Sequence, residues 1–327
     1  MQPINKLIAV IALAVLMQSC TQDKPGWWKN DQIPSGKRED FHQRNKVALT
    51  CLKDDNYKFL KTLVSRELMT STYTIRQAES ISNRLVANDY TLFDEYYIVN
   101  KWKSADTVIN KAVNENSYNL YYKGVAREMY MAFFLPKTGD NKWMITIVYA
   151  KLDYGWRITL LDVQPYTING KTSPQLFDLA KQEAAKKFYA NAEINMELAD
   201  ACLRPNDLWQ YPNDSLIHTF HTECLVEANQ HIKVPLVIDA VPSHPRIFRI
   251  VSEKTAQGTY PMIYYQTSVN LNNIDAIKKE NEAIKKVIGK VIEGIDKDND
   301  HLLYTAFNKM PNPRESVDRY EMDDKLK

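Results

Sequence analysis

Glycine is scarce in this sequence, with 9 residues among 327, and no two glycines stand in the spacing Gly-x-Gly. The dinucleotide-binding fingerprint needs closely spaced glycines, so it is excluded. Gly289 and Gly294 are five residues apart, as in a phosphate-binding loop. Ile295 and Asp296 follow, however, where that loop requires lysine and then serine or threonine. Nucleotide binding by these two routes is therefore excluded.

Signatures of common hydrolases are also missing. The sequence has no Gly-x-Ser-x-Gly elbow, and no two histidines bracket a glutamate as they do in zinc proteases. The formal net charge is only +2, which gives no general attraction to nucleic acid. We therefore expect no nucleic-acid partner and no cofactor, and the lack of catalytic signatures favours a non-catalytic protein.

An apolar run covers Leu7–Met17 and is followed by Ser19 and Cys20. Its length fits the roughly 7–15 residues of a signal-peptide core and is below the roughly 20 that span a bilayer. The stretch resembles the lipobox of bacterial lipoproteins, in which the cysteine is acylated and becomes the N-terminus. It departs from the family pattern at Met17, where leucine is preferred, and at Gln18, where a small residue is preferred.

The lipobox resemblance implies a signal peptide over residues 1–19 and lipidation of Cys20. The expected location is the cell envelope, with the chain attached to membrane lipid, on the outer membrane facing the periplasm or the surface. The alternative is an ordinary cleaved secretory signal with a coincidental cysteine. Two or more acyl chains hold a protein stably at a membrane, whereas one does not.

Only three cysteines lie outside this leader: Cys51, Cys202 and Cys224. The envelope is oxidising, so one disulfide is feasible. Cys202 and Cys224 stand on either side of a proline-containing turn between predicted helices, which makes them the candidate pair. Two separate buried thiols are the alternative, because cysteine is a common core residue.

The chain after the leader changes its hydrophobic period several times. Residues 20–40 are polar and lack periodicity, which predicts a tether. A spacing of three to four predicts helices after Asn45 and over Ile75–Val86. An alternating pattern then predicts strands over residues 117–136 and 142–170, with a turn at Asp153–Gly155.

Two helices followed by a long antiparallel meander resemble the nuclear-transport-factor-two-like family, over residues 41–172. The resemblance implies a curved sheet that wraps a helix and leaves a concave pocket. Some members of that family are isomerases or dehydratases, and many are binding or assembly modules. Side chains on strands that could line such a pocket as acids or bases are Tyr122, Glu128, Tyr130 and Asp162.

The remaining chain divides into three parts. Residues 173–232 predict a helical bridge, in which Ala192, Met196 and Ala199 resemble the second helix of a tetratricopeptide unit. Residues 233–310 combine β-like segments with a long helix and predict a small α+β lobe. Residues 311–327 are charged and predict a disordered tail. The expected fold class is thus α+β throughout.

Two segments contain residues that could bind metal. His218, His221 and Cys224 recur every three residues and would share a helix face as zinc ligands, but a closed site needs a fourth ligand, which His231 or His244 would have to supply. The segment DKDNDH at residues 296–301 begins like a calcium loop, but His301 and Phe307 replace the required glycine and glutamate. A helix with partly buried histidines and a solvated acidic turn are the favoured interpretations.

These observations lead to one main hypothesis and two alternatives. The main hypothesis is a lipid-anchored envelope protein that binds or assembles with an envelope protein or a small ligand, without catalysis. The first alternative is an acid–base enzyme of isomerase or hydrolase type that uses the cone pocket. The second is a zinc-binding protein.

Overall fold

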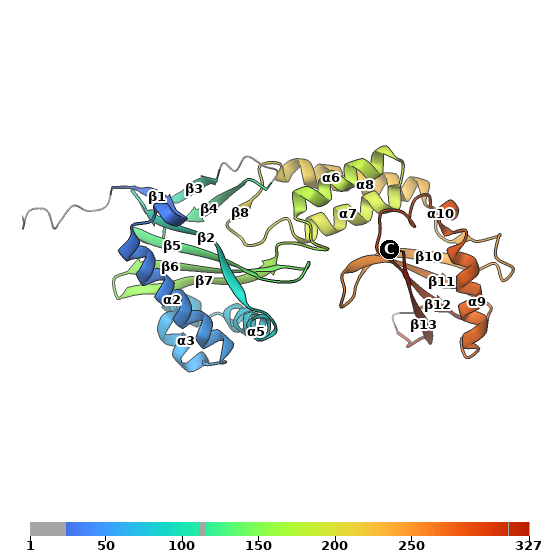
Figure 1. The fold of residues 1–327 in the computed structure, drawn as a ribbon, viewed down its shortest axis with the longest axis horizontal. Coiled ribbons are helices and arrows are strands. Elements are labelled where there is room, and N and C mark those ends of the chain that lie inside the picture. The colour runs from blue at the N-terminus through green and yellow to red at the C-terminus, as the bar shows by residue number, and fades with distance from the viewer. Residues whose placement is uncertain (1–23, 111–115, 313, 327) are drawn as a thin grey trace, which may run out of the picture.

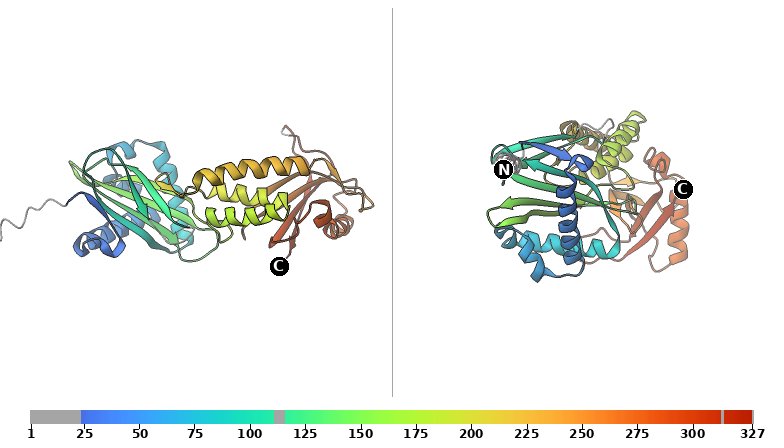
Figure 2. Two further views of the ribbon diagram at one scale, coloured as in Figure 1. Left: turned by 90° about the horizontal axis from the view of Figure 1, so that it is seen from above. Right: turned by 60° about the vertical axis from the view of Figure 1, so that its left-hand side comes forward.

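The computed structural model describes residues 24–110, 116–312 and 314–326. The α+β fold class expected from the sequence is confirmed. Three parts follow one another along the long axis: an N-terminal α+β domain, a helical bridge and a C-terminal lobe (Figures 1 and 2). Within the described ranges, no helix combines the length and apolar character needed to cross a membrane. Cys20 and the expected signal peptide over residues 1–19 lie outside these ranges.

The N-terminal domain is built on a five-stranded antiparallel sheet, here called the main sheet. Its strand order is β1-β2-β5-β6-β7. The strands are β1 (Gly26–Lys29), β2 (Tyr90–Val99), β5 (Glu128–Pro136), β6 (Trp143–Leu152) and β7 (Gly155–Pro165).

Both faces of the main sheet are covered. Helices α2 (Ser35–Lys53), α3 (Tyr57–Leu63), α4 (Arg66–Met69) and α5 (Thr72–Ala87) contribute to the core on one face (Figure 1). The other face, where a cone-like fold would leave a pocket, packs against the bridge and a second sheet, β3 (Ala105–Asn110), β4 (Tyr118–Lys123) and β8 (Trp209–Gln210). Covering both faces explains why β5 and β6 are nearly continuous apolar runs.

The expected tether over residues 20–40 is wrong from Gly26 onward. Strand β1 pairs with β2, so that Gly26 lies opposite Val99, and a short 3₁₀ turn, η2 (Asn30–Gln32), leads into α2. The sequence obscures this because β1 is a four-residue edge strand and Pro34 caps a helix instead of interrupting a linker. The folded domain therefore begins within six residues of Cys20.

The bridge consists of α6 (Ser173–Ala185), α7 (Tyr189–Ala201) and α8 (Asp214–His231), which match the predicted helical region. Helix α6 begins with a capping box between Thr172 and Gln175 and has Pro174 in its first turn. Strand β8, between α7 and α8, pairs with β4. The bridge is therefore joined to the N-terminal domain through a shared sheet as well as through the chain.

The C-terminal lobe is a five-stranded sheet in the order β13-β12-β11-β10-β9, packed on α9 (Ile274–Lys285) and α10 (Ile288–Val291). Its strands are β9 (Leu236–Val237), β10 (Arg246–Lys254), β11 (Thr259–Gln266), β12 (His301–Phe307) and β13 (Arg319–Lys325). The expected disordered tail is wrong, because β13 pairs with β12 along its whole length. Tyr320 and Met322 pack on the core, whereas Arg319, Glu321 and Asp323, which alternate with them, are exposed.

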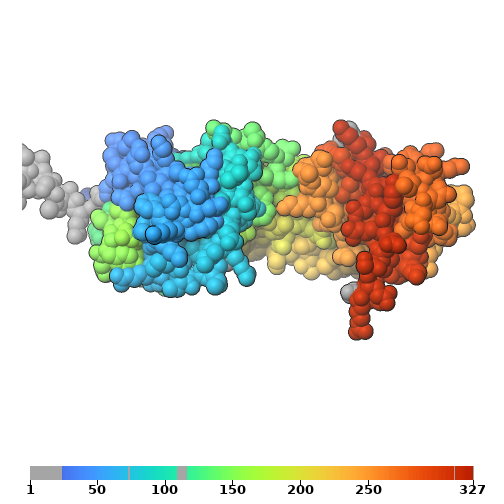
Figure 3. Space-filling view, turned by 90° about the horizontal axis from the view of Figure 1, so that it is seen from below, coloured from blue at the N-terminus to red at the C-terminus, as the bar shows by residue number. Residues whose placement is uncertain are grey.

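The lobe also contacts the N-terminal domain directly. The Asn169 side chain accepts a hydrogen bond from the Thr259 backbone N–H at 2.9 Å and donates one to the Thr259 carbonyl at 2.6 Å. Lys254 Nζ lies 5.2 Å from the centre of the Trp143 ring. In the space-filling view of Figure 3, orange residues of the lobe adjoin green residues of the N-terminal domain. The lobe is thus held at two points.

Candidate functional site

The four expected pocket residues do not share a pocket. Glu128 and Tyr130 lie on the helix-covered side of the main sheet, Asp162 on the opposite side, and Tyr122 on the second sheet. Glu128 contacts Lys151 at 2.6 Å, Tyr97 at 2.7 Å and Lys37 at 3.4 Å. Burial alone would raise the pKa of Glu128, but these three partners outweigh it and lower that pKa. Glu128 is therefore held as a paired carboxylate.

Tyr130 belongs to a buried charge cluster centred on Glu95, which is fully buried. Glu95 accepts hydrogen bonds from Arg38 Nε at 2.5 Å and from Tyr130 Oη at 2.5 Å, and it lies 3.0 Å from His42 Nε2. Burial and the Glu95 charge raise the pKa of Tyr130 far above its usual value. Because both Glu95 oxygens are engaged, this cluster joins α2 to β2 and does not present a free acid or base.

The candidate zinc ligands do not form a site. His218 is exposed and lies 3.6 Å from Asp200, whereas Cys224 is buried in the hydrophobic core. His221 is only partly buried. In the portion of the chain that the structure describes, no three His, Cys, Asp or Glu side chains are grouped to hold a metal ion.

Cys202 and Cys224 are both buried in the same core, and both thiols are free in the structure, as is Cys51. The Cys202 thiol donates a hydrogen bond to the Leu198 carbonyl at 3.3 Å. Burial is the main cause that raises the pKa of Cys202 and of Cys224 to about 12. The arrangement is that of separate buried thiols, which are protonated and unreactive at neutral pH.

Two acidic side chains of the turn at residues 296–301 form ion pairs with lysines of the protein itself. Asp298 pairs with Lys186 of α6 at 2.9 Å, and Asp296 pairs with Lys297 at 3.1 Å. Lys186 also contacts Glu183 at 3.1 Å. This turn therefore connects the lobe to the bridge.

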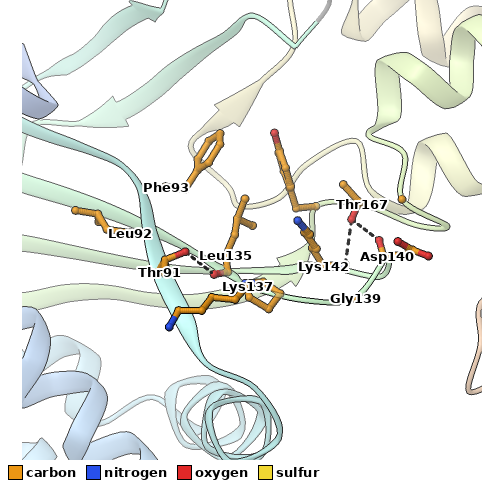
Figure 4. A pocket seen from close by; sticks show the side chains of 12 residues that line it. Thr91, Leu92, Phe93, Leu135, Lys137, Gly139, Asp140, Lys142 and Thr167 are labelled. Carbon is orange, nitrogen blue, oxygen red and sulfur yellow. Dashed lines mark hydrogen bonds between the residues drawn. The ribbon is translucent and has the colours of Figure 1, made fainter.

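A large open pocket lies at the end of the main sheet and is shown in Figure 4. It has a volume of about 610 Å³. Polar groups that line it form hydrogen bonds within the surrounding turns. Thr167 Oγ1 donates to the Asp140 carbonyl at 2.6 Å and accepts from the Lys142 backbone N–H at 3.0 Å. Gly139 and Gly170, with φ of +91° and +74°, provide the turn backbone. These groups are explained by the turns themselves.

A smaller pocket of about 290 Å³ lies where the bridge meets the lobe, and we call it the junction pocket. Helices α7 and α8, the segment after α8 and strand β10 form its walls. The lining residues are Ala190, Glu193, Glu197, Leu225, Ala228, Asn229, Ile232, Val234, Phe248, Arg249 and Ile250. Leu225 and Val234 are 46% and 47% exposed, so apolar surface is open to solvent there.

Two carboxylates of α7 line the junction pocket. Glu193 and Glu197 are four residues apart and therefore project from the same helix face. Ser252 Oγ of β10 donates a hydrogen bond to Glu197 at 2.7 Å. Burial is the main cause, and the neighbouring Glu197 the next, that raise the pKa of Glu193 to about 7. A carboxylate with a raised pKa beside open apolar surface is a typical feature of functional sites.

The spacing of Glu193 and Glu197 in the sequence is itself a signal of this site, although it matches none of the motifs discussed above. The α7 segment YANAEINMELADA is mostly apolar, and Glu193 and Glu197 are like charges at a spacing that destabilises an isolated helix. An unfavourable pair of like charges within a mostly apolar helix indicates a role beyond helix formation. The β10 wall could not be found in this way, because it is 50 residues or more away in the chain.

We expect Glu193→Gln to stabilise the protein at high pH only. Because the folded state raises the pKa of Glu193 from 4.5 to about 7, its ionisation opposes folding increasingly between these values and fully above pH 7. The variant should gain about 1–3 kcal/mol in the free energy of unfolding above pH 7 and nothing below pH 4.5.

Urea unfolding at both pH values measures this difference. The charged groups that face Glu193 in the pocket and could alter this difference are Glu197 and Arg249, whereas the neighbouring Cys224 thiol stays protonated at both pH values. Glu39→Gln, at an exposed site on α2, is the matched control and should change the free energy of unfolding by less than about 0.5 kcal/mol. Equal stability of Glu193→Gln and the unsubstituted protein above pH 7 would contradict the expectation.

Comparison of the chain with protein-family models, with curated proteins and with solved structures gives no match.

Proposed function

We propose that this chain is a lipid-anchored protein of the cell envelope that binds a partner protein, without catalysis, at the junction pocket. The lipobox-like run that ends in Cys20 supports the anchor. The junction pocket is the observation that carries the binding role. It combines exposed apolar side chains with two carboxylates on a rigid helix.

The size of the junction pocket indicates what fits in it. A volume of about 290 Å³ is at the lower limit for pockets that enclose a small ligand. It suits one large side chain inserted from a partner, which is how interfaces concentrate their binding energy. Apolar walls at Leu225, Phe248 and Ile250 would hold the body of that side chain.

The charged residues of the junction pocket indicate which class of partner it can bind. Two carboxylates line the pocket, Glu193 and Glu197 on α7, against one arginine, Arg249. A basic partner segment with an apolar anchor is therefore the complementary surface. The same carboxylates would disfavour an acidic segment.

The acid–base alternative has less support. On the helix-covered side of the main sheet, Glu95 accepts a hydrogen bond from Tyr130, and Glu128 accepts one from Tyr97. Asp162 lies on the opposite side of the sheet. No described group of these residues combines a free acid with a free base in one cavity. The geometry therefore favours binding.

Site-specific photo-cross-linking in the native envelope tests the proposal. A photoreactive residue at position 229, on the pocket wall, should yield one defined adduct. Leu225→Asp should reduce that adduct by about tenfold or more, because it places a charge in the apolar wall. Glu193→Gln combined with Glu197→Gln should also reduce it.

A photoreactive residue at Lys278, exposed on α9, is the control and should yield no such adduct. Because Leu225 is exposed, Leu225→Asp should leave thermal unfolding nearly unchanged. An adduct that Leu225→Asp does not weaken, or that forms equally from position 278, would rule out the junction pocket as the binding site.

A further inference from the structure

The end of the main sheet where the chain enters the fold carries an exposed tryptophan between two lysines. Trp102 is 71% exposed, and Lys101 and Lys103 on either side of it are also exposed. These residues form the tip of the loop between β2 and β3. Because Gly26 pairs with Val99, the start of β1 lies beside the start of this loop.

The loop that presents Trp102 is held firmly at its base. Asn100 donates from Nδ2 to the Ala126 carbonyl at 2.7 Å and accepts from Tyr122 Oη at 3.0 Å. The Gly124 backbone N–H donates to the Ser104 carbonyl at 2.8 Å. A side chain at Gly124 would come within 3.1 Å of both Asn100 and Ser104, so the base is closely packed. Trp102 thus projects from a fixed support.

The surrounding surface is basic. Lys24 and Lys123 are exposed at the same end of the sheet, since Lys123 pairs with Ala105 directly after the loop. Within the described residues, neither Lys103 nor Lys123 has an ion-pair partner, and Lys101 Nζ lies 5.7 Å from the centre of the Trp102 ring. The exposed acid nearest in the chain is Asp106.

The lipid attachment point is close to this surface. Gly26 is the sixth residue after Cys20, and a fully extended chain over six residues spans at most about 20 Å. An acyl group at Cys20 would therefore hold this end of the domain within about 20 Å of the bilayer. Tryptophan prefers the headgroup region, and lysines next to a membrane are attracted to anionic lipids.

We propose that the Lys101–Trp102–Lys103 loop, with Lys24 and Lys123, docks on the surface of an anionic lipid bilayer. The inference depends on the proposed anchor for its biological setting but not for its test. Docking at this end directs the long axis away from the bilayer. The C-terminal lobe lies at the far side of the molecule from β1 in Figure 1. The lobe and the junction pocket, which strand β10 of the lobe helps to form, would then face partners above the membrane.

Vesicle binding of the unlipidated chain tests the docking surface alone. The mature chain with Cys20→Ser should co-sediment with vesicles of phosphatidylethanolamine and phosphatidylglycerol, and much less with phosphatidylcholine. Trp102→Ala should weaken binding by about tenfold or more. Lys101→Glu with Lys103→Glu should weaken it by at least about fivefold for each lysine.

Two control variants carry matched changes elsewhere. Val86→Ala removes another highly exposed apolar side chain, and Lys278→Glu with Lys279→Glu reverses two exposed charges on α9. Both should bind as the parent does. Absence of vesicle binding, or binding that the loop variants do not weaken, would overturn the docking surface.

Mass spectrometry of the native protein separates this inference from the proposed function. An unmodified Cys20 together with loop-dependent vesicle binding would refute the anchor and retain the docking surface. A lipidated Cys20 without loop-dependent vesicle binding would retain the anchor and refute the docking surface.

Discussion

Replacement of Arg38 by alanine is expected to lower the free energy of unfolding by about 3–5 kcal/mol. Arg38 Nε lies 2.5 Å from Glu95, whose side chain is fully buried on β2. Removal of the guanidinium leaves a buried carboxylate with His42, Tyr130 and the surrounding apolar core, and the desolvation of that charge is then poorly compensated.

Arg44→Ala on the same helix is the matched control. Arg44 pairs with Asp40 at 2.9 Å, and both side chains are partly exposed to solvent, so its removal should cost less than about 1 kcal/mol. Urea denaturation at neutral pH measures both values. Equal losses for Arg38→Ala and Arg44→Ala would show that the buried charge cluster does not stabilise the N-terminal segment.

Replacement of Trp209 by alanine is expected to lower the free energy of unfolding by about 3–5 kcal/mol. Trp209 on β8 is 1% exposed. Its ring stacks on Tyr118 with 3.4 Å between ring centres and meets Phe133 of the main sheet edge-on at 5.9 Å. The side chain thereby joins the second sheet, the main sheet and the chain between two bridge helices.

Trp102→Ala provides the control, because it removes the same side chain from an exposed loop and should change stability by less than about 0.5 kcal/mol. Thermal unfolding followed by circular dichroism compares the two variants. A second, lower transition in Trp209→Ala would indicate that the bridge has separated from the N-terminal domain. A loss below about 1 kcal/mol would contradict the role assigned to Trp209.

Short patterns in the sequence correctly predicted those turns and helix starts whose conformation depends on residues close together in the chain. The turn at Asp153–Gly155 and the strands on either side are confirmed, and Gly155 has the positive φ of +100° that glycine readily adopts. The helix start predicted at Ser173–Pro174 is confirmed as well, because Thr172, Pro174 and the apolar spacing that follows mark it.

Strands β1 and β13 could not be predicted, because both are edge strands whose structure depends on the strand with which they pair. Strand β1 pairs with β2, which is more than 60 residues away, and its short length gives no alternating pattern. In β13 the inward residues Tyr320 and Met322 alternate with charged residues, and the charged composition of the segment therefore suggested disorder. For such strands the pairing partner determines the structure more than the local sequence does.

The candidate sites depended on which face of each strand is buried, and alternation alone does not give that. Glu128 and Tyr130 point to the helix side, whereas Asp162 on β7 points to the opposite side. The junction pocket combines α7, α8 and β10, so no single segment contains it. Of its features, only the pair of carboxylates on α7 could be recognised from the sequence.

Intact-mass analysis of the protein extracted from its native membrane tests the central claim, a lipid-held binding protein, most directly. The account predicts a chain that begins at Cys20 and carries a diacylglyceryl group on that residue. An unmodified Cys20 thiol, or a chain that retains residues 1–19, would contradict it.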